Sequence, residues 1–141
     1  MGDDHGVGAT LEAVRSLKLG EVVIIPTDTT YALATDALNE KAVAKLFSIK
    51  MREAGKALPV LVSDFNMIDK VALASQSLKE YMQQCGSITA VLPARGWVPL
   101  RLRGGKLTVG VRISTHPFVE RVVKAFGGPI TGTSANIAGR G

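Results

Sequence analysis

The sequence contains few of the residues that build disulfides and metal sites. Its single cysteine, Cys85, has no partner for an internal disulfide, and its two histidines, His5 and His116, have no neighbour at metal-ligand spacing. We therefore expect no metal ion held by protein side chains. The scarcity of cysteine also favours a reducing, cytoplasmic location.

Long hydrophobic runs are absent as well. No apolar stretch approaches the roughly 20 residues that a membrane-spanning helix needs, so we expect no membrane partner. Residues 1–8 have neither a basic start nor an apolar core, which is unlike a signal peptide and predicts a loose polar tail. Aromatic residues make up only 5% of the chain, which leaves few platforms on which unpaired bases could stack.

The remaining composition is that of one globular domain spanning residues 1–141. Apolar residues make up 46% of the chain and charged residues 21%, which suits a packed core and is unlike a disordered chain. There are 17 lysines and arginines against 12 acidic residues, a net charge of +5. This surplus favours an anionic partner such as a nucleotide, phosphate or RNA, although inert domains are often as basic.

Apolar spacing predicts that helices and short strands are interleaved along the chain. The expected helices are 10–19, 41–52, 67–74, 77–84 and 117–126, and the expected strands are 22–26, 31–35, 58–62, 88–92, 107–113 and 129–133. This succession indicates an α/β fold with a twisted, mixed (parallel and antiparallel) sheet and flanking helices.

The chain is organised around residues 22–31, where an apolar β-branched run stops at Pro26 and hydroxyl-bearing residues follow. We expect a strand buried on both faces, because short runs of valine and isoleucine are typical of such strands. Residues 27–30 would then form a loop at the carboxyl end of a buried strand, where open α/β sheets bind ligands. A polar turn that satisfies its own backbone is the alternative.

Polar and basic side chains gather at four places near predicted strand or helix ends. These are the loop 27–30; Lys50, Arg52 and Lys56; Thr108 with Arg112; and Thr131, Thr133, Ser134 and Asn136. Arginine can pair with a carboxylate through two parallel hydrogen bonds and lysine supplies a point charge, so these cations could hold a triphosphate and a carboxylate. Each group taken alone also has a structural explanation, as a solvated charge or a helix cap.

Four motifs occur in order: Pro-Thr-Asp-Thr with a following tyrosine, Lys-x-Arg, Val-Gly-Val-Arg-Ile followed by His-Pro, and Thr-Ser-Ala-Asn. With these motifs the sequence resembles the YrdC-like family of threonylcarbamoyl-AMP synthases, from about Leu11 to Gly139. The most specific part of the resemblance pairs Lys-x-Arg with Ser-x-Asn, here Lys50, Arg52, Ser134 and Asn136.

The resemblance implies a YrdC-like sheet around a deep, positively charged cavity. It implies that ATP, L-threonine and bicarbonate are the substrates, that Mg²⁺ accompanies ATP, and that threonylcarbamoyl-adenylate and diphosphate are the products. The adenylate would serve the threonylcarbamoyl modification of adenosine in tRNA, so tRNA or the tRNA-modification machinery is an expected partner. The implied site comprises catalytic Lys50 and Arg52; threonine-binding Thr29, Arg112 and Gly132; and ATP-binding Arg52, Lys56, Thr108, Ser134 and Asn136.

These residue types suit that chemistry. N-carboxylated threonine is an anion, and it must attack the α-phosphate of ATP, which is another anion. The two approach only where cations neutralise both, as Lys50, Arg52 and Arg112 could do.

The sequence departs from the family pattern at several positions. Ala32 follows the tyrosine where glycine is usual, Ala57 stands where the family has proline, and the usual Pro-Gly-Pro-x-Thr reads Cys-Gly-Ser-Ile-Thr. The chain also stops soon after Thr-Ser-Ala-Asn, so the C-terminal part of the family domain is expected to be absent. Because that part helps to enclose ATP in the family, we expect weakened ATP binding.

Two alternative hypotheses keep the same fold. One is a carbamoyl-adenylate-forming homologue, since a related domain in hydrogenase-maturation carbamoyltransferases uses carbamoyl phosphate; this sequence shows neither the zinc-finger nor the acylphosphatase modules of those chains. The other is a non-catalytic module that binds double-stranded RNA or tRNA. The net charge and a loop with Arg95, Arg101, Arg103 and Lys106 favour it.

Overall fold

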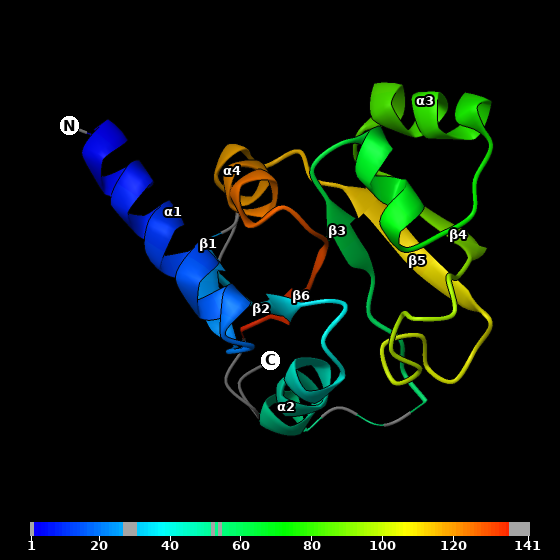
Figure 1. The fold of residues 1–141 in the computed structure, drawn as a ribbon, viewed down its shortest axis with the longest axis horizontal. Helices are drawn as coiled ribbons and strands as arrows, with labels where there is room; N and C mark the ends of the chain where they lie inside the picture. The colour runs from blue at the N-terminus through cyan, green and yellow to red at the C-terminus, as the bar shows by residue number, and fades with distance from the viewer. Residues whose placement is uncertain (1, 27–30, 52, 54, 136–141) are drawn as a thin grey trace.

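The computed structural model describes residues 2–26, 31–51, 53 and 55–135, with side chains from residue 7 onward. Figure 1 shows how helices and strands alternate along this part of the chain. In chain order the elements are α1 (Gly2–Lys18), β1 (Val23–Pro26), β2 (Tyr31–Asp36), α2 (Glu40–Lys50), β3 (Val60–Val62), the 3₁₀ helix η1 (Phe65–Lys70), α3 (Gln76–Cys85), β4 (Thr89–Pro93), β5 (Thr108–Ile113), α4 (Pro117–Phe126) and β6 (Ile130–Ser134).

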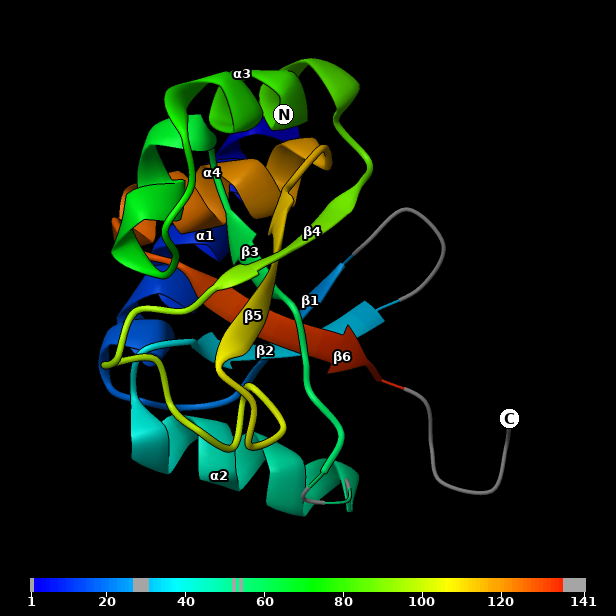
Figure 2. The same cartoon turned by 90° about the vertical axis from the view of Figure 1, so that its right-hand side faces the viewer.

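The described strands form one six-stranded sheet in the order β1-β2-β6-β3-β5-β4. β3 and β5 pair in parallel, and every other neighbouring pair in this sheet is antiparallel. Figure 2 shows the twisted sheet crossing the middle of the molecule. The predicted α/β fold with a mixed sheet and flanking helices is therefore confirmed.

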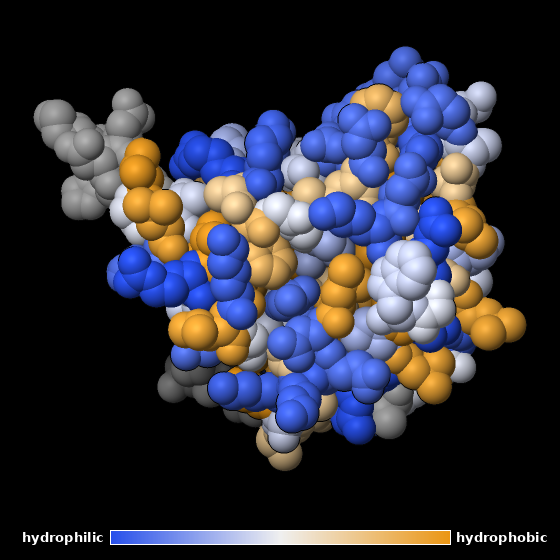
Figure 3. Space-filling view, in the orientation of Figure 1, coloured by the Kyte–Doolittle hydropathy of each residue, from blue (hydrophilic) through white to orange (hydrophobic). Residues whose placement is uncertain are grey.

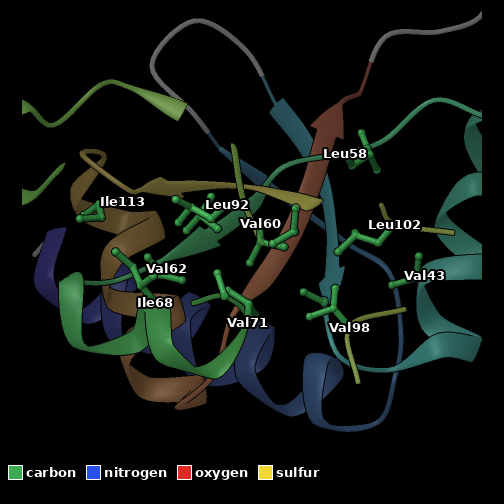
Figure 4. Close-up of a cluster of buried hydrophobic side chains, with 14 of the residues drawn as sticks. Val43, Leu58, Val60, Val62, Ile68, Val71, Leu92, Val98, Leu102 and Ile113 are labelled. Carbon is green, nitrogen blue, oxygen red and sulfur yellow. The ribbon is translucent and has the colours of Figure 1, made fainter. Parts of the chain in front are cut away.

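Helices cover both faces of the sheet, and each face has its own hydrophobic core. α1 and α4 pack on one face, where Leu17 and Val122 are fully buried together with strand residues. α2, α3 and η1 cover the other face and build the larger core, part of which is drawn in Figure 4. Because side chains alternate along a strand, neighbours such as Val60 and Leu61 contribute to different cores.

Short-range signals set the bounds of α2 and α4, the two helices nearest the candidate site. The Asn39 side chain caps α2 by accepting a hydrogen bond of 3.0 Å from an amide in the first turn. α4 begins at Pro117, and His116 Nδ1 accepts a hydrogen bond of 3.2 Å from the amide of Phe118. Gly127 ends α4 with a φ of 81°, so the predicted helix 117–126 is confirmed.

The amino-terminal segment differs from its prediction. The sequence predicts a loose tail over residues 1–8, but α1 is helical from Gly2. The second half of α1 is held in place because Ala13 and Leu17 pack in the core. Extending a formed helix costs little where no proline interrupts it, which explains why the helix continues towards the amino terminus.

β1 is not the doubly buried strand that the sequence predicts. It lies at the edge of the sheet and pairs only with β2. Ile25 is buried, but Ile24 is 66% exposed, so only one face of β1 is covered. Its β-branched residues identify a strand correctly. The composition of one strand does not reveal whether other elements will pack on one of its faces or on both.

The predicted helix 67–74 is also different, because the structure has the shorter 3₁₀ helix η1 there. It begins earlier, at Phe65, where the Asp64 side chain accepts hydrogen bonds from the amides of Asn66 and Met67.

None of the helices in the described part of the chain has the length and apolar character of a membrane span.

Candidate active site

A cavity of about 290 Å³ opens on the face of the sheet that also carries α1 and α4. Strands β1, β2, β3, β5 and β6 and helix α4 all contribute to its lining. The lining includes Ile25, Ala34, Leu61, Arg112, Gly132 and Ser134. They come from segments far apart in the sequence, so only the sheet brings them together.

Strand register explains why a cavity exists at this place. Ala34 on β2 is opposite Gly132 on β6, and Ala32 is opposite Ser134, so small residues form the floor. A Cβ atom on Gly132 would lie 3.1 Å from the carbonyl oxygen of Leu33, so any side chain there would crowd β2. Glycine at this position therefore keeps the floor open and its backbone accessible to a ligand.

Arg112 forms one wall of the cavity. It lies on β5 opposite Leu61 of β3, which is also in the lining. Within the described part of the chain, Arg112 is the only charged residue that lines the cavity, and its side chain has no hydrogen bond or ion pair there. A guanidinium without a carboxylate partner can bind an incoming carboxylate through two parallel hydrogen bonds.

The described lining of the cavity carries less positive charge than the family resemblance implies. The lining is mostly apolar, with Leu61, Val119 and Ile25 facing the same space as Arg112. Among the described residues, the positive charge at the cavity comes from Arg112 in the lining and from Lys50 at the rim. Such a cavity suits a small anion that carries an apolar group.

Lys50 lies at the carboxyl end of α2, where Met51 turns the chain out of the helix with a φ of 54°. The Lys50 Nζ atom donates a hydrogen bond of 2.8 Å to the carbonyl oxygen of Ser134. Ser134 ends β6 and lines the cavity, so this contact places the Lys50 ammonium at the cavity rim. The structure therefore brings together four of the predicted residues: Lys50, Arg112, Gly132 and Ser134.

Lys56 and Thr108 lie at the same end of the sheet but do not line the cavity. Val60 pairs in parallel with Val111 and antiparallel with Thr131, so the residues before β3 and β5 and those after β6 leave the sheet at one end. Thr108 lies on the same face as Arg112, about 13 Å along β5. Lys56 is exposed and pairs with Glu53 at 3.6 Å.

Three predicted site residues, Thr29, Arg52 and Asn136, lie outside the described residues, as does the whole loop 27–30. The flanking strands are described: Pro26 pairs with Tyr31, and Ala32 pairs with Ser134. β1 therefore ends, and β2 begins, at the same end of the sheet as Ser134.

Sequence reasoning missed the apolar wall of the site. Val119 reaches the cavity from the first turns of α4, and Ile25 and Leu61 reach it from two different strands. The alternating pattern of strands could have suggested that Leu61 and Val60 face opposite ways. The pairing of strands and the position of α4 carry the rest of the information, and neither can be read from residue spacing.

No group of three metal-ligating side chains occurs within the described ranges. At the cavity itself the described donors are hydroxyl groups and backbone atoms, with no carboxylate. This donor set does not fit a resident Mg²⁺ ion, which prefers carboxylate oxygens. A magnesium ion that arrives with nucleotide phosphates needs no such ligands.

The architecture defines a class of protein: an α/β domain whose twisted, mixed sheet carries a ligand-sized cavity over small residues, with cations at one wall and at the rim. A family model named Sua5_yciO_yrdC and described as telomere recombination matches residues 15–141. The chain belongs to this Sua5/YciO/YrdC family.

Individual relatives agree with the family assignment. The threonylcarbamoyl-AMP synthase of Vibrio vulnificus (strain YJ016) is 34% identical over 134 residues, which cover 92% of this chain and 72% of that protein. The crystal structure of P. abyssi Sua5 complexed with L-threonine matches with a TM-score of 0.83 and 31% identity, over 92% of this chain and 39% of that longer chain. E. coli YciO matches with a TM-score of 0.76 and 25% identity, over 93% of this chain and 65% of that chain.

Proposed function

We propose that this chain is a threonylcarbamoyl-AMP synthase. It would form threonylcarbamoyl-adenylate and diphosphate from L-threonine, bicarbonate and ATP. The observation that supports this most directly is the guanidinium of Arg112, which has no hydrogen bond or ion pair among the described residues and lies in a mostly apolar cavity. The names of its relatives support the same reaction, as does the threonine complex of P. abyssi Sua5.

In this proposal Arg112 binds the carboxylate of threonine. A planar guanidinium matches a carboxylate with two hydrogen bonds, which also fixes the orientation of the amino acid. Gly132, which is half-buried and lines the cavity, is proposed to offer backbone hydrogen bonds, and the apolar wall with Leu61 and Val119 would accommodate the methyl group. Thr29 is the remaining proposed threonine contact.

The amine of threonine is first carboxylated by bicarbonate, with loss of water. An oxygen of the resulting carbamate must then attack the α-phosphate of ATP and displace diphosphate. Both groups are anionic, so cations at the cavity rim lower the barrier by holding them together and neutralising charge. Lys50 is placed at this rim by its hydrogen bond to Ser134. Arg52 follows two residues later in the sequence and is proposed for the same task.

ATP would lie across the end of the sheet. Ser134 belongs to the cavity, while Lys56 and Thr108 lie further along the same end, which gives an extended polar surface for a triphosphate. Asn136 is proposed to contact ATP as well. Mg²⁺ would enter with ATP and shield its phosphates, while this chain's lysines and arginines bind the remaining charge.

The adenylate product would serve the threonylcarbamoyl modification of tRNA in the cytoplasm, with the tRNA-modification machinery as the acceptor. Transfer to an acceptor is chemically reasonable, because a carbamoyl–phosphate anhydride is an activated group. The partner would therefore be a protein or RNA that uses the adenylate.

One assay tests the proposal: release of diphosphate from ATP in the presence of bicarbonate, with and without L-threonine. Release should require threonine, and L-serine should support it less well because it lacks the methyl group that contacts the apolar wall. Release that requires carbamoyl phosphate in place of bicarbonate would assign the alternative carbamoyl-adenylate reaction. Absence of threonine-dependent release by the folded protein would contradict the proposal.

A further inference from the structure

A second hollow lies beside the cavity of the candidate active site. It is a groove of about 300 Å³ that is lined by α1, by the edge strand β1 and by Phe118 of α4. Four of its lining residues share one face of α1: Ala9, Glu12, Ala13 and Ser16. Apolar groups reach the surface along α1, in the left-hand part of Figure 3. We call this hollow the α1 groove.

Ile25 is the one lining residue that the cavity and the α1 groove share among the described residues. Its side chain is 2% exposed and packs in the core cluster that also holds Ala13 of α1 and Val119 of α4. Consecutive residues of α4 divide in the same way, because Val119 lines the cavity and Phe118 lines the groove. Ile25 and the first turn of α4 therefore form the partition between the two spaces.

On the side of β1 this partition is one side chain thick. Ile25 and Ile24 point to opposite faces of the strand, and Ile24 is 66% exposed and borders only the groove. On the groove side, the same core cluster contributes Ala13, whose side chain is a single methyl group. Shortening Ile25 would therefore remove the side chain that separates the cavity from the groove.

The proposed position of the amino acid sets its distance from Ile25. With its carboxylate on Arg112 and its backbone over Gly132 of β6, the amino acid lies two strands from β1. At about 4.8 Å per strand, roughly 10 Å separates β6 from β1 across the sheet. The strand between them contributes Ala34, a small residue, to the floor. The methyl group of threonine ends short of Ile25, whereas a longer unbranched side chain directed along the floor would meet it.

We propose that Ile25 determines specificity by limiting the length of the amino-acid side chain that the cavity accepts. This inference rests on the proposed function, because it takes the amino acid to bind with its carboxylate on Arg112. A side chain that reaches Ile25 is stopped by a buried, β-branched residue with few alternative rotamers. Without Ile25 the side chain would continue into the α1 groove, whose lining includes the apolar residues Val23 and Phe118.

Amino acids with unbranched side chains of increasing length test the proposal. The series is L-norvaline, L-norleucine, L-2-aminoheptanoate and L-2-aminooctanoate, with L-threonine as the reference, and kcat/KM for diphosphate release is measured with ATP and bicarbonate. In the wild type, kcat/KM should fall by about tenfold or more at the first side chain that reaches Ile25, since one misfitted methylene costs a pocket at least that much. In Ile25→Ala this fall should disappear over the whole series, because the groove accommodates the added carbons.

Further variants separate the partition from the packing of β1. Ile25→Val keeps most of the buried side chain if Ile25→Ala does not fold, and it should weaken the fall by a smaller factor. Ile24→Ala is the matched control, because it removes the same atoms from a residue that borders only the groove. Val23→Ala loosens β1 on the face of Ile25 without opening the cavity. Both controls should leave the length at which kcat/KM falls unchanged, and thermal unfolding by circular dichroism checks that each variant is folded.

Calorimetric titration of the same amino acids without ATP distinguishes this inference from the proposed function. Absence of threonine-dependent diphosphate release in the wild type would contradict the proposed function, while the affinities would still report whether Ile25 limits side-chain length. A fall at the same length in the wild type, Ile25→Val and Ile25→Ala would overturn the inference alone. A fall that moves by only one carbon in Ile25→Ala would overturn it as well, because the cavity would then be enlarged but still closed from the groove.

Discussion

Arg112 is the residue on which the proposed recognition of threonine most depends. Replacing it with lysine keeps the positive charge but removes the two-pronged geometry, so threonine affinity should fall by roughly tenfold. ATP affinity should change much less, because phosphate tolerates a point charge. Calorimetric titration of each ligand measures both effects.

Arg121→Lys is the matched control, because Arg121 lies over the Phe118 ring on α4 and does not line the cavity. It should leave both affinities unchanged. Weakened ATP binding with unchanged threonine binding in Arg112→Lys would reverse the assignment of this residue.

Lys50 has a structural contact and a proposed catalytic role, and substitution can separate them. Lys50→Ala should abolish threonine-dependent diphosphate release, as should Arg52→Ala, because the two anions would lose the cations between them. The fold should persist, since the Lys50 hydrogen bond to Ser134 is exposed. Lys45→Ala, an exposed lysine of the same helix, should retain full activity. Near-normal turnover in Lys50→Ala would remove this residue from the proposed site.

Asp36 makes stability depend on pH. Burial raises the pKa of its carboxyl group above the usual 3.8, and a hydrogen bond from the Leu38 amide opposes this shift only in part. The unfolded chain then loses the proton at lower pH than the folded chain. The free energy of unfolding should therefore fall as the pH rises from 3.8 through the raised pKa of the folded state.

Asp36→Asn keeps an oxygen that can accept from the Leu38 amide but cannot ionise. The variant should lack this fall in stability, so it should be the more stable protein at pH 7 and match the wild type at pH values below both pKa values. Urea unfolding at a series of pH values measures the difference. A wild type that gains stability over the variant as the pH rises would contradict the assigned direction.

At the scale of elements, local signals in the sequence predicted what local forces decide. α4 was predicted with correct bounds, because Pro117 and Gly127 act within one turn of the helix ends. The burial of both faces of β1 was predicted wrongly. It depends on the place of β1 in the sheet, which is at the edge, and on which elements pack on its faces. The start of α1 was missed because helix extension depends on the packed part of the helix, which composition near the terminus does not show.

The end of α2 can be improved by one substitution. Met51 is the only described non-glycine residue with a positive φ, at 54°, and its side chain is 82% exposed. Glycine adopts this conformation without strain, so Met51→Gly should raise the free energy of unfolding by about 1 kcal/mol. Ser48→Gly, an exposed position inside the helix, should instead lower it by about 0.5 kcal/mol. Denaturant unfolding of both variants tests the opposite signs.

At the scale of the whole molecule, the candidate site combines what sequence motifs predict with what only the fold provides. The motifs singled out Lys50, Arg112 and Ser134, and the family resemblance added Gly132. The structure places Arg112, Gly132 and Ser134 in the lining of one cavity and Lys50 at its rim. Lys50, Arg112 and Ser134 could be found because charged and hydroxyl side chains near strand and helix ends are visible in the sequence. The apolar wall could not be found, since Val119 looks like any core residue of an amphipathic helix.

The two cores lie on opposite faces of one sheet, so we expect the described elements to unfold as a single cooperative unit. Val122 is fully buried in the core under α1 and α4, whereas Trp97 lies on the loop anchored in the other core. Val122→Ala removes two buried methyl groups and should lower the free energy of unfolding by about 2 kcal/mol. Val91→Ala, which is the same change at a position 70% exposed on β4, should alter it by less than about 0.5 kcal/mol.

Trp97 fluorescence and far-ultraviolet circular dichroism together read out this cooperativity. In Val122→Ala the two signals should shift to the same lower midpoint of urea unfolding, although Trp97 lies far from the substitution in sequence and on the other core. The shared strands carry the effect, because residues such as Val60 and Leu61 are adjacent in the chain and pack on opposite faces. A Trp97 transition that keeps its wild-type midpoint while the dichroism separates into two steps would show that the two cores unfold independently.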